Sequence, residues 1–91
     1  MANHFTHGPK EFSREISPQA RQVFTHALTG IDAVLYEPIA VSTENNHGTN
    51  YAFLCNAIQV TPHSSPYPAM VSVFEDLNGR IGLTQIEKLS F

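Results

Sequence analysis

The sequence contains a single cysteine, few basic residues and no long apolar run, and each of these scarcities excludes a class of protein. Cys55 has no second cysteine with which to form a disulfide, which is typical of a reducing compartment. Five lysines and arginines against eight acidic residues give a net charge of −3, so the chain lacks the basic surface that nucleic acid requires. No apolar run approaches the roughly 20 residues of a membrane span, and residues 1–10 do not resemble a signal peptide. We therefore expect a cytoplasmic protein with neither a nucleic-acid nor a membrane partner.

The length of the chain limits what it can build. A chain of 91 residues buries roughly 60–65% of its unfolded surface, which is enough for one modest core. The apolar content of 42% is that of a globular protein. Residues 1–16 are polar and contain Gly8-Pro9, so we expect a flexible N-terminal arm over residues 1–16 and a single domain over residues 17–91.

The clearest local pattern is that of one amphipathic helix. Ser17 can accept a hydrogen bond from a free amide as the N-cap residue, and Pro18 suits the first helical position. Apolar residues follow at the spacing of one helix face: Ala20, Val23, Phe24, Ala27, Leu28 and Ile31. Gly30 can adopt the left-handed conformation that ends a helix, so we expect three to four turns that stop there.

Four β-rich segments follow the helix. They are residues 33–43, 51–61, 69–77 and 81–91, separated by turn signals at Asn45–Gly48, residues 62–68 and Asn78-Gly79. Short links join antiparallel strands, because parallel strands need long crossovers. The sequence therefore predicts an α+β fold in which one N-terminal helix packs across a four-stranded antiparallel sheet.

Two of these segments show signs of irregular pairing. Pro38 has no amide hydrogen to donate, so its strand is expected at a sheet edge or with a bulge. In the last segment the apolar spacing changes parity between Leu83 and Ile86, which predicts a bulge or a helical turn. Residues 51–61 are apolar almost throughout, as expected of a central strand.

No arrangement of reactive side chains is typical of an enzyme. Cys55 falls in the middle of an apolar segment, where a buried cysteine acts as a small hydrophobic residue. His4 and His7, with His47 or His63, lack a carboxylate or cysteine that would complete a metal site. The carboxylates are scattered, the glycines stand apart at turns, and no nucleophile motif occurs. We expect no catalysis, no metal and no cofactor.

One segment, residues 44–51 (ENNHGTNY), resembles the first hairpin of the cystatins, and especially that of the single-domain, disulfide-free stefins. In that family the hairpin reads Gln-x-Val-x-Gly and is often followed by Thr-Asn-Tyr, so the sharp match lies at Gly48–Tyr51. Residues 73–79 (VFEDLNG) look like the family's third strand and second hairpin. The order of elements is also similar, so the resemblance covers most of residues 17–91.

The resemblance implies a function of binding without chemistry. Cystatins inhibit papain-like cysteine proteases by inserting a wedge, made of the N-terminal arm and two hairpins, into the substrate cleft. The positions here that match those contacts are Gly8, Glu44, Asn45, Asn46, His47, Gly48, Leu77 and Asn78.

The match departs from the family at four of these positions. Glu44 replaces the glutamine, Asn46 replaces the valine, and Leu77-Asn78 lacks the Pro-Trp or Leu-Pro of inhibitory members. A polar Asn46 at a contact costs about 1–3 kcal/mol where it is left unpaired. We expect a small cystatin-like binding protein, monomer or homodimer, with cysteine-protease inhibition as its specific form. The alternative is a self-associating module in which the apolar residues 51–60 pair two chains.

Overall fold

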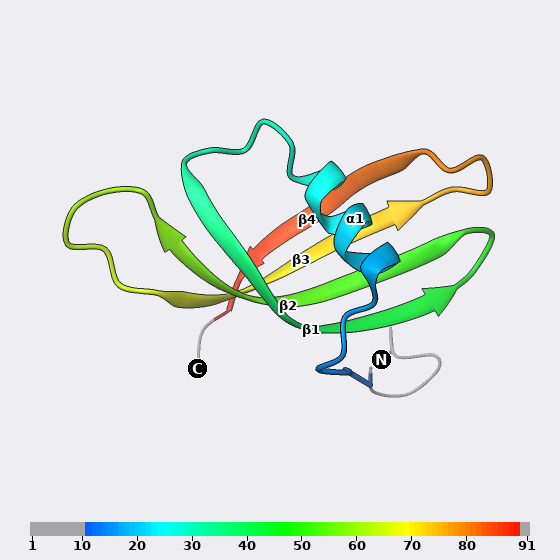
Figure 1. Cartoon of the computed structure of the whole chain (residues 1–91), viewed down its shortest axis with the longest axis horizontal. Coiled ribbons are helices and arrows are strands. Elements are labelled where there is room, and N and C mark those ends of the chain that lie inside the picture. Colours follow the sequence, from blue (N-terminus) through cyan, green and yellow to red (C-terminus); the bar gives the residue numbers. More distant parts are fainter. Residues whose placement is uncertain (1–10, 90–91) are drawn as a thin grey trace.

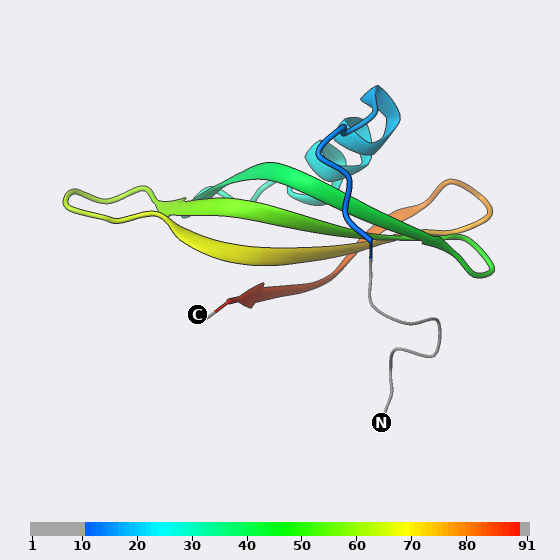
Figure 2. The same cartoon turned by 90° about the horizontal axis from the view of Figure 1, so that it is seen from below.

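A computed structural model describes residues 11–89 as one helix on a twisted antiparallel sheet (Figure 1). The elements in chain order are α1 (Pro18–Ala27), β1 (Val34–Asn45), β2 (Thr49–Gln59), β3 (Tyr67–Glu75) and β4 (Ile81–Lys88). The strands lie in the order β1-β2-β3-β4, and each neighbouring pair is antiparallel. Helix α1 lies across one face of the sheet (Figure 2). The predicted α+β class is confirmed, and no helix within residues 11–89 is long and apolar enough to span a membrane.

Helix α1 begins where its sequence predicts and ends earlier. The Ser17 hydroxyl accepts a hydrogen bond from the Ala20 amide at 3.1 Å, and Pro18 occupies the first turn. The last helical residue is Ala27, and Gly30, with a φ of 90°, belongs to the turn that follows. The apolar pattern continued past this point because Leu28 packs against the core from the turn rather than from the helix.

The core lies between α1 and the sheet face that it covers. Phe24 of α1 meets Phe53 of β2 edge to face, with ring centroids 4.8 Å apart, and Tyr51 stacks on Phe53 at 5.7 Å. Alternate residues of the strands complete the core, as the pleat of a sheet requires. The buried cluster is Ala20, Val23, Phe24, Val41, Tyr51, Phe53, Cys55, Val71 and Val73.

Both predicted irregularities are bulges. The pairing of β1 with β2 shifts between Pro38 and Ala40, and β1 is an edge strand, so the missing Pro38 amide is accommodated. In β4, Leu83 pairs with Val73 and Gln85 pairs with Ser72, which leaves Thr84 as the extra residue. The parity change in the sequence therefore marks this bulge.

The link predicted over residues 62–68 is too long at its C-terminal end, because Tyr67 and Pro68 open β3. The Pro68 carbonyl accepts a hydrogen bond from the Leu89 amide at 2.9 Å. The backbone N and O of an antiparallel residue point to the same side, so the missing amide of Pro68 faces the β4 side, just past the end of β4. Pairing with β2 therefore survives the proline.

The described end of the predicted arm, residues 11–16, contacts the outer edge of β1. The backbone of Ser13 exchanges two hydrogen bonds with that of Val41, each 2.9 Å long. These bonds occupy backbone groups at an edge that would otherwise be open to another strand. The remainder of the predicted arm lies outside the described residues.

Candidate functional site

The β1–β2 and β3–β4 turns lie at one end of the sheet, while the β2–β3 link lies at the other (Figure 1). This follows from the meander, since successive hairpins of an antiparallel sheet alternate between its two ends. The two hairpins matched to the cystatin contacts are therefore brought together by the topology. We call this the hairpin end and define it as residues 44–49 and 75–80.

The first hairpin has a polar tip closed by hydrogen bonds. Strands β1 and β2 close at the Asn45–Thr49 pair, where the Thr49 hydroxyl donates to Asn45 Oδ1 at 3.1 Å. The Asn46 amide donates to the Gly48 carbonyl at 2.9 Å. His47 adopts a φ of 54° and Gly48 a φ of 134°, so the reversal uses two residues with positive φ. The side chains of Asn46 and His47 project into solvent.

The second hairpin is organised by Asp76. Its Oδ1 atom accepts hydrogen bonds from the backbone amides of Asn78 at 2.9 Å and Arg80 at 2.8 Å. The Asp76 carbonyl accepts from the Gly79 amide at 3.0 Å, and the Asp76 amide donates to the Arg80 carbonyl at 2.9 Å. Leu77 stands at the start of this turn with 80% of its surface exposed, more than any other large apolar residue of the described chain.

The two hairpins are held to one another through the end of β3. Thr49 pairs directly with Glu75, and the Tyr51 hydroxyl donates to Glu75 Oε1 at 3.2 Å. Gly48 lies against the ring of Phe74, where a side chain would not fit. The geometry of one turn is therefore linked to that of the other by contacts with the strand that joins them.

The charges at the hairpin end are mainly negative. Glu44, Glu75 and Asp76 are opposed there by Arg80. Burial raises the pKa of the Tyr51 hydroxyl above its usual value, and the carboxylate of Glu75 beside it raises that pKa further. Tyr51 therefore stays protonated and donates to Glu75 at neutral pH.

The predicted site residues fall into three groups. Asn45, Asn46, His47, Gly48, Leu77 and Asn78 lie at or beside the two tips, as the resemblance implied. Glu44 is half-buried within β1 opposite Asn50, one pair further from the tip than Asn45. Gly8 lies outside the described residues.

Asp76 was missed by the sequence reasoning, although the sequence held a signal for it. An aspartate two residues before Asn-Gly is a pattern in which the carboxylate can accept from the amides of the turn. Asp76 and its neighbour Glu75 belong to the scattered carboxylates, which show no catalytic arrangement in the sequence. The structure shows that Asp76 organises the backbone of the β3–β4 turn.

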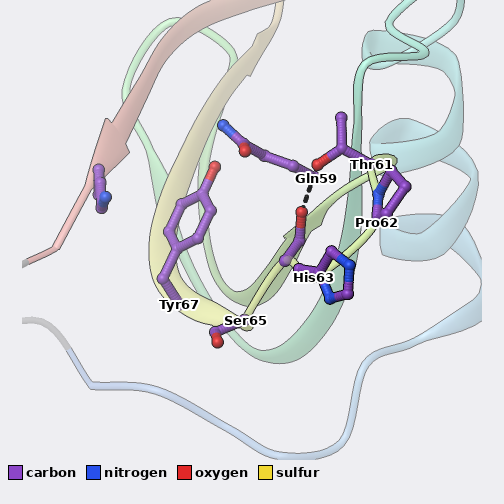
Figure 3. Close-up of a pocket in the computed structure, with 8 residues that line it drawn as sticks. Gln59, Thr61, Pro62, His63, Ser65 and Tyr67 are labelled. Carbon is purple, nitrogen blue, oxygen red and sulfur yellow. Dashed lines mark hydrogen bonds between the residues drawn. The ribbon is translucent and has the colours of Figure 1, made fainter.

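A second feature, an open polar hollow of about 360 Å³, lies at the opposite end of the sheet beside the β2–β3 link. Figure 3 shows Tyr67 and Gln59 on one side of it and Pro62 and His63 on the other. The hydroxyls of Thr61 and Ser64 hydrogen bond to each other within this link. The hollow is separated from both hairpin tips by the length of the strands, so it does not contribute to the hairpin end.

The free cysteine of the chain is buried. Cys55 is 1% exposed, and burial raises its pKa to about 12, so the thiol is held in its unreactive form. Within residues 11–89 no group of three histidine, cysteine or acidic side chains could hold a metal ion.

Comparison of the chain with models of protein families, with curated proteins and with solved structures found no match in any of the three. The order of one helix and four antiparallel strands, with a free cysteine and no disulfide, is the part of the resemblance that the structure bears out.

Proposed function

We propose that this chain is a cystatin-like binding protein that acts through the hairpin end, and that its partner is a papain-like cysteine protease. The observation that carries the proposal is the pair of tips at one end of the sheet, joined through the contacts of Gly48 and Thr49 with the end of β3. A wedge of two tips must keep its shape as it enters a cleft. Turns already closed by backbone hydrogen bonds lose little conformational entropy on binding.

The two tips offer a partner different chemistry. Leu77 supplies an exposed apolar side chain whose burial is favourable, whereas Asn46 and His47 supply hydrogen-bonding groups. We expect most of the binding energy to come from Leu77, since apolar groups that become fully buried dominate interfaces. The acidic character of the hairpin end favours a cleft that is free of carboxylates.

The mode of action is blockage of the cleft, with no reaction carried out by the inhibitor. The candidate nucleophile is Cys55. Its burial beneath α1 supports a mode of action in which this thiol does not react. A thiol reagent should fail to label Cys55 in the folded protein and should label it fully in denaturant. The variant Ser65→Cys, with its thiol in the exposed β2–β3 link, should react in both conditions and serves as the control. Rapid native labelling of Cys55 would contradict a purely structural role for it.

The direct test is inhibition of papain by the whole chain at micromolar concentration. Leu77→Ala should weaken inhibition by about tenfold or more, because it removes the exposed apolar group at a tip. Val60→Ala, a matched change at 58% exposure near the opposite end of the sheet, should leave inhibition unchanged. Asn46→Val should strengthen inhibition by restoring an apolar contact at the first tip. Absence of inhibition by both the wild type and Asn46→Val would reject the protease as partner.

A second candidate function is self-association, favoured by exposed apolar residues away from the hairpin end. Leu35 and Ile58 form a cross-strand pair with 60% and 36% of their surfaces exposed. The pair lies on the face opposite α1, because the neighbouring Tyr36 packs against the core. Pairing through residues 51–60, as first expected, would require β2 to leave its place between β1 and β3. Light scattering after size-exclusion chromatography tests self-association. A strict monomer at high concentration rejects this candidate. A dimer that dissociates in the variant Leu35→Ser supports it.

A further inference from the structure

The tip of the second hairpin contains the only asparagine of the sequence that is followed by glycine, Asn78-Gly79. Both residues are exposed, and a methyl group built on Gly79 would meet no atom within 4 Å. The other asparagines of residues 11–89 precede residues with side chains, and Asn50 and Asn56 also lie within β2. Asn45 and Asn46 are also exposed, so Asn78 is distinguished from them by the glycine that follows it and by the open space beside that glycine.

This arrangement is suited to one covalent reaction, intramolecular attack by the backbone on the side-chain amide. The Gly79 nitrogen gives its proton to solvent hydroxide and bonds to Cγ of Asn78. The bond from Cγ to Nδ2 breaks, and the amide nitrogen leaves as ammonia, so a five-membered imide remains. Water then adds across one of the two imide C–N bonds and yields aspartate or isoaspartate. The net change consumes one water and releases one ammonia.

We propose that Asn78 is a deamidation site and that the turn organised by Asp76 controls its rate. The attacking nitrogen is engaged, since the Gly79 amide donates to the Asp76 carbonyl at 3.0 Å. The flanking amides of Asn78 and Arg80 are both held by Asp76 Oδ1. Ring closure must break the hydrogen bond from the Gly79 amide to the Asp76 carbonyl. It must also rotate the backbone, which the two hydrogen bonds to Asp76 Oδ1 oppose. The folded hairpin is therefore slower to react than the same sequence in an unfolded chain.

The reaction alters the surface at one of the two tips. Either product places a new negative charge directly after Leu77, at an end of the molecule that already carries Glu44, Glu75 and Asp76. Isoaspartate also lengthens the backbone by one methylene and so changes the register of the turn. Deamidation itself does not depend on the proposed function, but it would give the hairpin end two chemical forms.

The test is mass spectrometry of the whole folded chain incubated at mildly alkaline pH, with peptide mapping at intervals. A mass increase of about one dalton should appear first at Asn78, with isoaspartate as a product. In denaturing urea the same site should react several-fold faster. Earlier modification of Asn45, Asn46, Asn50 or Asn56 would overturn the choice of site, and equal rates at Asn78 in the folded and unfolded chains would overturn the control by the fold.

A pair of variants isolates the role of Asp76. Asp76→Ala removes the Oδ1 acceptor and should accelerate reaction at Asn78 several-fold. Asp76→Asn keeps an oxygen at the same position and should react at close to the wild-type rate. Circular dichroism at the incubation temperature verifies that both variants are folded. If the two variants react at the same rate, the carboxylate oxygen does not restrain the turn and the proposed control is rejected, while the assignment of the site still rests on the wild-type map.

Discussion

Gly48 packs so closely against Phe74 that a Cβ atom built on the glycine would lie 2.6 Å from Cζ of the ring. The same Cβ would lie 2.6 Å from the carbonyl oxygen of Glu75. The first hairpin can therefore rest on the end of β3 only because position 48 has no side chain. Since β3 leads directly into the second hairpin, this contact sets the two tips side by side.

Gly48→Ala should destabilise the fold by about 2–4 kcal/mol, from strain at positive φ together with the clash against Phe74. The matched control is Gly79→Ala, which has a φ of 85° but open space around the new methyl group. It should cost only about 1–2 kcal/mol, the strain of the backbone alone. Urea denaturation followed by circular dichroism measures both. Equal losses would mean that the Gly48–Phe74 contact has no energetic weight.

Tyr51→Phe should lower the free energy of unfolding by about 0.5–1.5 kcal/mol, because it removes the hydroxyl that donates to Glu75 Oε1. Glu75→Gln keeps an oxygen acceptor and should cost less. Glu75→Ala removes the acceptor altogether, and its combination with Tyr51→Phe should cost less than the sum of the two single losses, since each change abolishes the same hydrogen bond. Strict additivity in this double-mutant cycle would show that the bond contributes nothing measurable.

Stability should fall as the pH rises from about 9 to about 12, because burial raises the pKa of Cys55 from 9.0 to about 12. The unfolded chain loses this thiol proton above pH 9 while the folded chain keeps it, so ionisation favours unfolding throughout that interval. The contribution is fully present below pH 9 and is lost as the pH approaches 12. The midpoint of urea unfolding, measured at several pH values across this range, gives the slope of stability against pH.

Cys55→Ala is the control for this alkaline loss and should make the slope shallower. Some loss of stability with rising pH remains in Cys55→Ala, because burial also raises the pKa of Tyr36 and Tyr51 above the usual value of 10.0. Ionisation of these hydroxyls in the unfolded chain also lowers the stability of the fold at the upper end of this pH range. An unchanged slope in Cys55→Ala would contradict the assignment to the thiol.

Ser13→Pro should destabilise the protein by about 1 kcal/mol, because proline cannot donate to the Val41 carbonyl. Ser13→Ala keeps both backbone bonds to Val41 and loses only the exposed hydroxyl contacts with Glu15, so it should be nearly neutral. Thermal unfolding of the two variants distinguishes them. If they melt together, the bridge to β1 does not stabilise the fold.

The sequence predicted those features that depend on neighbouring residues. The start of α1 follows from the hydroxyl of Ser17 and the fixed φ of Pro18, which act within one turn of chain. The bulge after Pro38 follows from a missing amide, and the bulge at Thr84 from the change in apolar spacing between Leu83 and Ile86. Each is a local constraint that the rest of the molecule accommodates.

The candidate site was predicted only in part. The residues of both tips could be named because turn chemistry and the match at Gly48–Tyr51 marked them. The role of Asp76 was missed, because it consists of backbone hydrogen bonds formed only when the turn closes. Nothing local to Gly48 indicates that Phe74, far along the chain, fills the space beside it.

The amino-acid sequence by itself thus determined the α+β class, the order of the elements and the positions of the two irregularities, since periodicity, capping and turn preference act over a few residues. Only the tertiary structure decided that α1 ends at Ala27, that Pro68 joins β3 and that Ser13 bonds to Val41. It also decided that the two hairpins meet through Gly48 and Phe74. These outcomes depend on contacts between segments distant in sequence, which exist only once the sheet has formed.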